Sequence, residues 1–92
     1  IGNFRVGRVR IKKNNSYING LKIIEIENRG PLYDKGARPN DIIISINNES
    51  ANWMNLTSSL KFATLGEILN LEILNQNNEL IKLNFESYDE TS

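Results

Sequence analysis

Side chains suited to covalent or metal chemistry are scarce in this chain. Its 92 residues include no histidine and no cysteine, which excludes disulfides, Ser–His–Asp triads, Cys–His pairs and the usual zinc sites from this segment. Glu25 and Glu27 have the spacing of one strand face, but no third ligand accompanies them, so we expect neither a metal site nor a cofactor. A small hydrolase that uses Asp or Glu is the enzyme hypothesis that stays open, and no paired-acid motif supports it.

The backbone near the amino terminus offers a different kind of site. Phe4 and Val6 are apolar at one parity of the first predicted strand, and Val9 and Ile11 at the other. Because alternate residues of a strand face opposite ways, this change of phase predicts a bulge or small loop, and Gly7 is the residue that permits one. The kink is either a purely structural bulge or a loop whose free amides hold a ligand.

The composition limits the classes of function. The length is that of one domain, and 11 Lys and Arg balance 11 Asp and Glu, which argues against nucleic-acid binding. No apolar run approaches the roughly 18 residues that span a bilayer, and we expect no signal peptide within this segment. The chain starts at Ile1 rather than Met, so we expect a piece of a longer protein whose anchor, if any, lies elsewhere.

Hydrophobic periodicity predicts five strands and two helices. The strands are predicted at Phe4–Ile11, Leu21–Ile26, Ile42–Ile46, Ile68–Leu74 and Ile81–Phe85. The helices are predicted at Pro31–Lys35, closed by Gly36, and at Asn52–Leu65, closed by Gly66. Turns are expected at 38–41, 47–50 and 75–78, and an exposed loop at 12–17. The fold class is therefore α+β: a small β-sandwich or partly open barrel of about five strands, capped by one long and one short helix.

The longer predicted helix combines a cap with an apolar stripe. Asn52 is suited to cap its amino terminus. One buried face is expected from the residues at helical spacing, which are Trp53, Leu56, Leu60 and Ala63. We expect residues 1–86 to form the domain and the polar residues 87–92 to form a flexible tail.

Two segments of the chain together resemble the signature of bacterial PDZ domains. They are Gly20–Ile26 and Gly30–Asn47. The family pattern is a glycine and a hydrophobic strand, then S/G-P-A-x-x-A-G-hydrophobic-x-x-G/N-D-hydrophobic-I-hydrophobic-x-I-N/D. The resemblance covers about Phe4 to Phe85, and within the family Asn40–Ser45 looks most like HtrA-type envelope serine proteases, including DegS-like sensors.

This sequence departs from the family pattern at several positions. Tyr33 and Lys35 replace small residues, and Leu65 replaces a proline. The family's carboxylate-binding loop reads aromatic-hydrophobic-Gly-hydrophobic, whereas the matching segment here is Arg5-Val6-Gly7-Arg8.

The resemblance implies that an extended peptide adds as a strand between the first strand and the long helix. Amides of Val6, Gly7 and Arg8 would hold its terminal carboxylate as a small nest, with a charge-assisted bond from Arg5 or Arg8. The peptide-binding residues it implies are Arg5, Val6, Gly7, Arg8, Val9, Trp53, Thr57, Leu60 and Lys61. The structural alternative makes Trp53 a packing anchor and the arginines a solvated strand face.

Two functions follow from the resemblance. The first is a regulatory or substrate-recruiting module of an envelope protease, which binds protein C-termini or unfolded segments and acts on the parent protease domain. The alternative is a docking domain of a type II secretion C-type component or another envelope assembly, which binds a partner without binding peptides. Both imply a periplasmic location, tethered to the inner membrane through the rest of the parent chain, and no catalysis within these residues.

Overall fold

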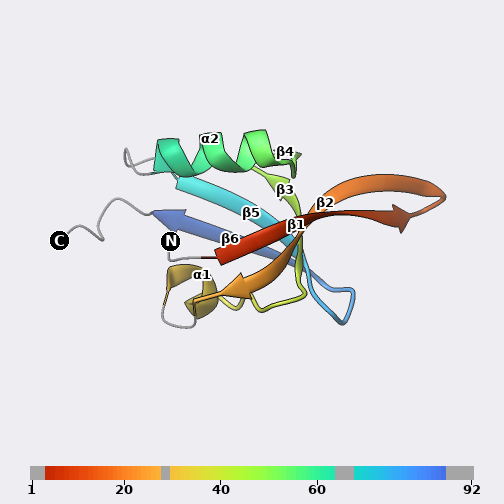
Figure 1. Ribbon diagram of the computed structural model, residues 1–92, viewed down its shortest axis with the longest axis horizontal. Coiled ribbons are helices and arrows are strands. Elements are labelled where there is room, and N and C mark those ends of the chain that lie inside the picture. The colour runs from red at the N-terminus through yellow and green to blue at the C-terminus, as the bar shows by residue number, and fades with distance from the viewer. Residues whose placement is uncertain (1–3, 28–29, 64–67, 87–92) are drawn as a thin grey trace.

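The computed structural model describes residues 4–27, 30–63 and 68–86. These contain one antiparallel sheet and two helices (Figure 1). In chain order the elements are β1 (Phe4–Lys13), β2 (Ser16–Ile26), α1 (Pro31–Asp34), β3 (Ile42–Ile46), β4 (Glu49–Ser50), α2 (Trp53–Ala63), β5 (Ile68–Leu74) and β6 (Leu80–Glu86). The strand order is β1-β2-β3-β5-β6, with β4 paired to β3. The α+β prediction is confirmed, with six strands rather than five in an unclosed sheet.

The core lies on the sheet between the two helices. Leu69, Leu71 and Ile73 are buried at alternate positions of β5, as their spacing predicts. Leu32 of α1 and Leu56 of α2 are buried against the same cluster. Among the described residues, the other buried apolar side chains are Leu21, Ile23, Ala37, Ile43, Ile46, Ala51 and Leu83. None of the helices within the described ranges is long and apolar enough to cross a membrane.

The segment 12–17, expected to be an exposed loop, continues the β1–β2 hairpin instead. Lys13 pairs with Ser16, and the two residues between them, Asn14 and Asn15, have φ of 51° and 65°. Two positive φ angles are the geometry of a type I′ turn, whose twist matches that of paired strands. The loop prediction was wrong because polarity was read as irregular structure, although asparagine tolerates this conformation better than most residues.

The phase change in β1 has another cause than a kink at Gly7. Pairing with β2 is continuous from Val6, opposite Ile23, to the end of the strand. The irregularity falls between Arg5 and Val6, and it leaves Ile24 of β2 as the extra residue. The prediction of a bulge at Gly7 is therefore wrong in both position and strand.

Both faces of β1 instead contact apolar side chains, at different points along the strand. Phe4 and Val6 pack on the main core. Val9 faces the other side of the sheet, where a Cβ at Gly20 would lie 2.7 Å from Ile42 Cγ2 and 3.7 Å from Val9 Cγ2. Because the strand changes the face that it buries, its apolar residues change parity while the backbone stays regular.

Helix α2 begins as predicted, but Trp53 lies outside its buried face. The Asn55 amide donates to Asn52 Oδ1 at 2.7 Å, which confirms the predicted cap. Leu56 is buried, whereas Trp53 is 60% exposed and does not belong to the buried stripe. The side chains of Leu60 and Ala63, and residues Leu65, Gly66 and 87–92, lie outside the described part of the structure. At the other helix, Gly36 has φ of 111°, the left-handed geometry expected after α1.

Candidate functional site: a groove between β1 and α2

Strand β1 forms one edge of the sheet. Its only pairing among the described strands is with β2, and the β3, β5 and β6 strands lie beyond β2 (Figure 1). In an antiparallel edge strand, alternate residues direct N–H and C=O groups away from the sheet. This row of backbone groups is a template on which another extended chain can pair.

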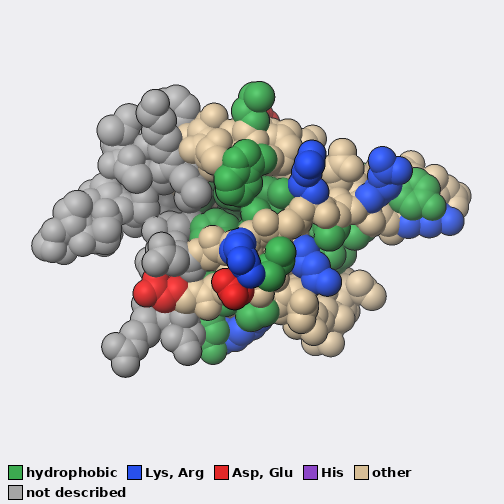
Figure 2. Space-filling view, in the orientation of Figure 1, with side chains coloured by type: hydrophobic (Ala, Val, Ile, Leu, Met, Phe, Trp, Pro, Cys, Tyr) green, Lys and Arg blue, Asp and Glu red, His purple; other side chains and the backbone are tan. Residues whose placement is uncertain are grey.

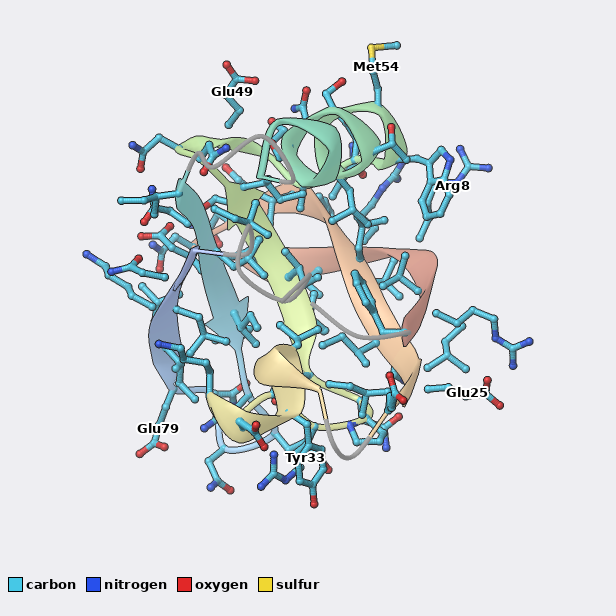
Figure 3. All side chains as sticks on the ribbon, turned by 90° about the vertical axis from the view of Figure 1, so that its left-hand side faces the viewer. Arg8, Glu25, Tyr33, Glu49, Met54 and Glu79 are labelled. Atoms are coloured by element: carbon cyan, nitrogen blue, oxygen red, sulfur yellow. The ribbon has the colours of Figure 1, made fainter. Side chains whose placement is uncertain are left out.

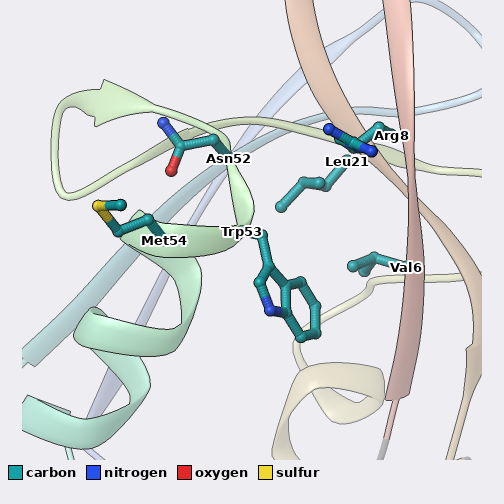
Figure 4. Close-up of a pocket in the computed structure, with 6 residues that line it drawn as sticks. All are labelled: Val6, Arg8, Leu21, Asn52, Trp53 and Met54. Carbon is teal, nitrogen blue, oxygen red and sulfur yellow. The ribbon is translucent and has the colours of Figure 1, made fainter.

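A cavity of about 700 Å³ lies beside this edge, between β1 and the start of α2 (Figure 4). Its lining consists of Val6, Arg8, Leu21, Asn52, Trp53 and Met54. Its volume falls within the roughly 300–1,000 Å³ typical of ligand pockets. Its apolar wall combines residues from two strands with an indole from the helix, so it can hold an apolar side chain of a bound segment.

The first turn of α2 is fixed by hydrogen bonds that hold Trp53 over the cavity. The Leu56 amide donates to the Asn52 carbonyl oxygen at 2.9 Å, in addition to the cap bond already described. Asn55 Nδ2 donates to the Ser50 carbonyl oxygen at 2.8 Å and ties the turn to β4. Because the helix start is held on both sides, Trp53 presents its ring to the cavity without belonging to the core.

A second cavity, of about 230 Å³, lies next to the first, toward the β1–β2 hairpin. It shares Arg8 and Asn52 with the first cavity and adds Val9, Asn19, Gly20 and Ala51. Figure 3 shows Arg8 on the α2 side of the molecule, with Tyr33 at the opposite, α1 end. We call these two cavities and the free edge of β1 the groove.

The structure brings together four of the residues predicted for peptide binding. Val6, Arg8 and Trp53 line the first cavity. Val9 borders the second, although its side chain faces the other side of the sheet. Gly7 lies in the paired strand between them. The contact of these residues with a ligand remains a prediction.

The other predicted residues lie elsewhere. Arg5 lines a separate hollow at the start of β1. The Thr57 hydroxyl donates to the Trp53 and Met54 carbonyl oxygens at 3.0 and 3.1 Å, within its own helix. The side chains of Leu60 and Lys61 lie outside the described part of the structure.

The predicted carboxylate nest is not formed at Val6, Gly7 and Arg8. These residues belong to a regular paired strand, in which successive amides point in opposite directions and cannot converge on one anion. Arg5 Nη2 lies 3.4 Å from Glu25 Oε2, and Glu27 lines the same hollow. The acidic surroundings of Arg5 disfavour binding of a carboxylate there.

Sequence reasoning missed three residues that line the first cavity, Leu21, Asn52 and Met54. It also missed three that line only the second cavity, Asn19, Gly20 and Ala51. Asn52 was interpreted only as a cap, and Leu21 only as the first residue of a strand. Met54 is 75% exposed next to Trp53. An exposed apolar pair in the first turn of a helix is the signal that could have found it.

Comparisons with known proteins bear on the fold. No protein-family model matches the chain, and no curated protein matches it. Among solved structures, the PDZ domain of EpsC from Vibrio cholerae (residues 219–305) matches with a TM-score of 0.52 and 12% sequence identity. The match covers 87% of this chain and 91% of that one. The chain therefore has a PDZ-like fold.

Proposed function

We propose that this chain is a protein–protein docking module whose groove receives an extended segment of a partner protein. The observation that carries the proposal is the unpaired edge of β1 beside a cavity with Val6, Leu21 and Trp53 in its wall. Main-chain hydrogen bonds along β1 would supply affinity, and the cavity would select one apolar side chain of the partner. This mode of binding needs no catalytic residue.

The likeness to the EpsC domain supports a docking role better than a protease-regulating one. The surroundings of Arg5 support the same choice, because a terminal carboxylate would meet Glu25 and Glu27 at the start of β1. We therefore propose that the partner segment binds through its backbone and side chains, with no requirement for a free C-terminus. The bacterial envelope and its assemblies remain the setting that the sequence resemblance implies.

Trp53 provides the test, because it is the chain's only tryptophan and lies in the groove. Short extended peptides from a display selection should shift its emission to the blue as they bind and cover the indole. Trp53→Ala should weaken binding, measured by calorimetry, by roughly tenfold or more, as expected for an aromatic anchor. Leu80→Ala is the matched control, since Leu80 is also an exposed apolar side chain but lies on β6.

The control should leave affinity within about twofold, because surface contacts outside an interface contribute little. Equal losses in the two variants, or binding without a change in Trp53 emission, would contradict the groove. Free and amidated forms of the same peptide should bind alike. A strong preference for the free form would restore C-terminal capture and the protease-type function.

A further inference from the structure

The zero net charge of the chain hides a segregation of its charges. All 11 acidic residues lie at Glu25 or beyond, whereas six of the 11 basic residues precede it. The first 24 residues therefore carry a net charge of +6, and the remaining 68 carry −6. Such asymmetry within one domain points to a surface that attracts a partner of opposite charge.

Part of this positive charge lies along the free edge of β1. Arg8, Arg10 and Lys12 occupy alternate positions of β1 and are exposed on one face. Val6 precedes them at the same spacing, so the cavity and the three cations lie on the same face of the strand. Figure 2 shows Lys and Arg side chains gathered over the β1–β2 hairpin.

These three cations differ from the basic residue that precedes them on the strand. Arg5 is paired with Glu25, whereas Arg8, Arg10 and Lys12 make no ion pair with any other described residue. Their regular spacing, about 6.6–6.8 Å from one to the next, is also the spacing of same-face side chains on a neighbouring strand. Each cation can therefore oppose one acidic residue of a strand added to β1.

We propose that the partner segment is acidic, with carboxylates at alternate positions opposite Lys12, Arg10 and Arg8 and an apolar residue opposite Val6. This rests on the proposed function of the groove. In antiparallel pairing, which is the more stable arrangement, the segment reads acidic-x-acidic-x-acidic-x-apolar from its amino end. Its apolar side chain enters the cavity between Leu21 and Trp53.

An anionic lipid surface is the other partner that a basic hairpin suggests. The hairpin turn itself is polar, Asn14-Asn15 followed by Ser16, and Tyr17 beside it is a single exposed aromatic side chain, which is little apolar surface for insertion into a membrane. The cations of β1 lie in a row along a free strand edge, which matches an extended acidic chain better than a flat surface. Vesicles are therefore included in the test as a competing outcome.

The test compares two blocked peptides with the full chain, using Trp53 emission and calorimetry. One peptide alternates glutamate with threonine at three positions and ends in leucine, and the other has glutamine for each glutamate. The acidic peptide should bind roughly tenfold more tightly, from three cross-strand pairs of opposite charge. This preference should shrink as salt rises, because exposed pairs are screened.

Two double variants test which residues of the protein cause the preference for the acidic peptide. Arg10→Gln combined with Lys12→Gln should abolish most of this preference. Lys22→Gln with Lys82→Gln removes the same charge from residues that do not face the groove, since Lys22 lies opposite Gly7 and Lys82 lies on β6. The control should keep the preference, which separates local pairing from long-range attraction.

The outcomes for the acidic segment and for the groove are distinguishable. Equal binding of both peptides, with the Trp53 shift intact, would overturn the acidic preference and leave the groove standing. An acidic preference that both double variants reduce equally, without a Trp53 shift, would overturn both. No binding of the acidic peptide, or binding only to phosphatidylserine vesicles, would also overturn the proposal.

Discussion

At the scale of single residues, Asp41 is the one polar side chain buried among the described residues, at 3% exposure. Its Oδ2 accepts a hydrogen bond from the Arg38 amide at 3.0 Å, and its own amide donates to the Arg38 carbonyl oxygen at 3.1 Å. Burial raises the pKa of Asp41, and the hydrogen bond and charge of Arg38 offset only part of that rise.

Asp41→Asn should therefore change how stability depends on pH. An acid whose pKa is raised on folding binds its proton more tightly in the folded state, so stability falls as pH rises from about 3.9 through the folded pKa and is flat above it. Each unit of the rise corresponds to about 1.4 kcal/mol. Urea unfolding of both proteins over this range should show the extra decline only in the natural chain. A difference in unfolding free energy that does not change with pH, or a decline seen only in the variant, would contradict a raised pKa at Asp41.

Tyr33 shows how a departure from a family pattern can be explained by a contact. The Arg38 guanidinium lies 3.6 Å from the centroid of the Tyr33 ring, and its Nη1 donates to the Tyr33 carbonyl oxygen at 2.8 Å. A cation over an aromatic face is stabilising. Tyr33, which replaces a small residue of the family pattern, therefore stabilises the packing of α1 against the loop before β3. Sequence reasoning could place both residues near a turn but had no basis for pairing them.

At the same scale, Asn52→Ala should destabilise the domain by about 1 kcal/mol, because the Asn55 amide loses its acceptor. Asn52→Asp retains an acceptor at the cap and should cost much less. Chemical denaturation measures both. If alanine and aspartate variants are equally stable, the cap does not hold the first turn of α2, and Trp53 is positioned by something else.

At the scale of elements, Asn47 joins three of them. It follows β3 with φ of 50°, and its Nδ2 donates to Ser59 Oγ of α2 at 3.1 Å. Its Oδ1 accepts from the Asn70 amide of β5 at 2.8 Å, and its own amide donates to the Asn70 carbonyl oxygen at 2.7 Å. One residue in a left-handed conformation therefore helps fix α2 on the sheet and so the wall of the groove.

Substitutions at Asn47 should separate its side chain from its backbone. Asn47→Ala loses two side-chain hydrogen bonds and retains an unfavourable φ, a cost of about 3 kcal/mol. Asn47→Gly loses the hydrogen bonds but relieves the backbone, and about 1–2 kcal/mol is expected. Asn48→Ala, at φ of 66°, is the control for strain alone. An unfolding free energy that is lower for Asn47→Gly than for Asn47→Ala would contradict this account.

The elements were largely predictable, because their signals are local. Alternation gave β5, the short apolar run gave β3, and Asn52 marked the start of α2. The failures depend on what covers each face, which the sequence does not state. The parity change in β1 was interpreted as a kink because one buried face was assumed, and Trp53 was assigned to a buried stripe because its spacing fits one.

At the scale of the whole molecule, the fold places an open strand edge, an apolar cavity and a row of cations on one side. Val6, Arg8 and Trp53 could be nominated from the sequence through the PDZ resemblance, and the structure brings them together. The predicted anion-binding nest is not formed, because successive amides of a regular strand point in opposite directions and cannot bind the same anion. The segregation of charge was readable in the sequence but was hidden by the zero total.

Amide hydrogen exchange along β1, with and without a saturating bound peptide, tests the docking proposal most directly. We expect new protection at alternate residues between Val6 and Lys12, because only amides directed away from β2 gain a partner. The other sheet edge, β6, should exchange unchanged and serves as the internal control. Protection that is absent from β1, or that develops on β6 instead, would contradict docking at this edge.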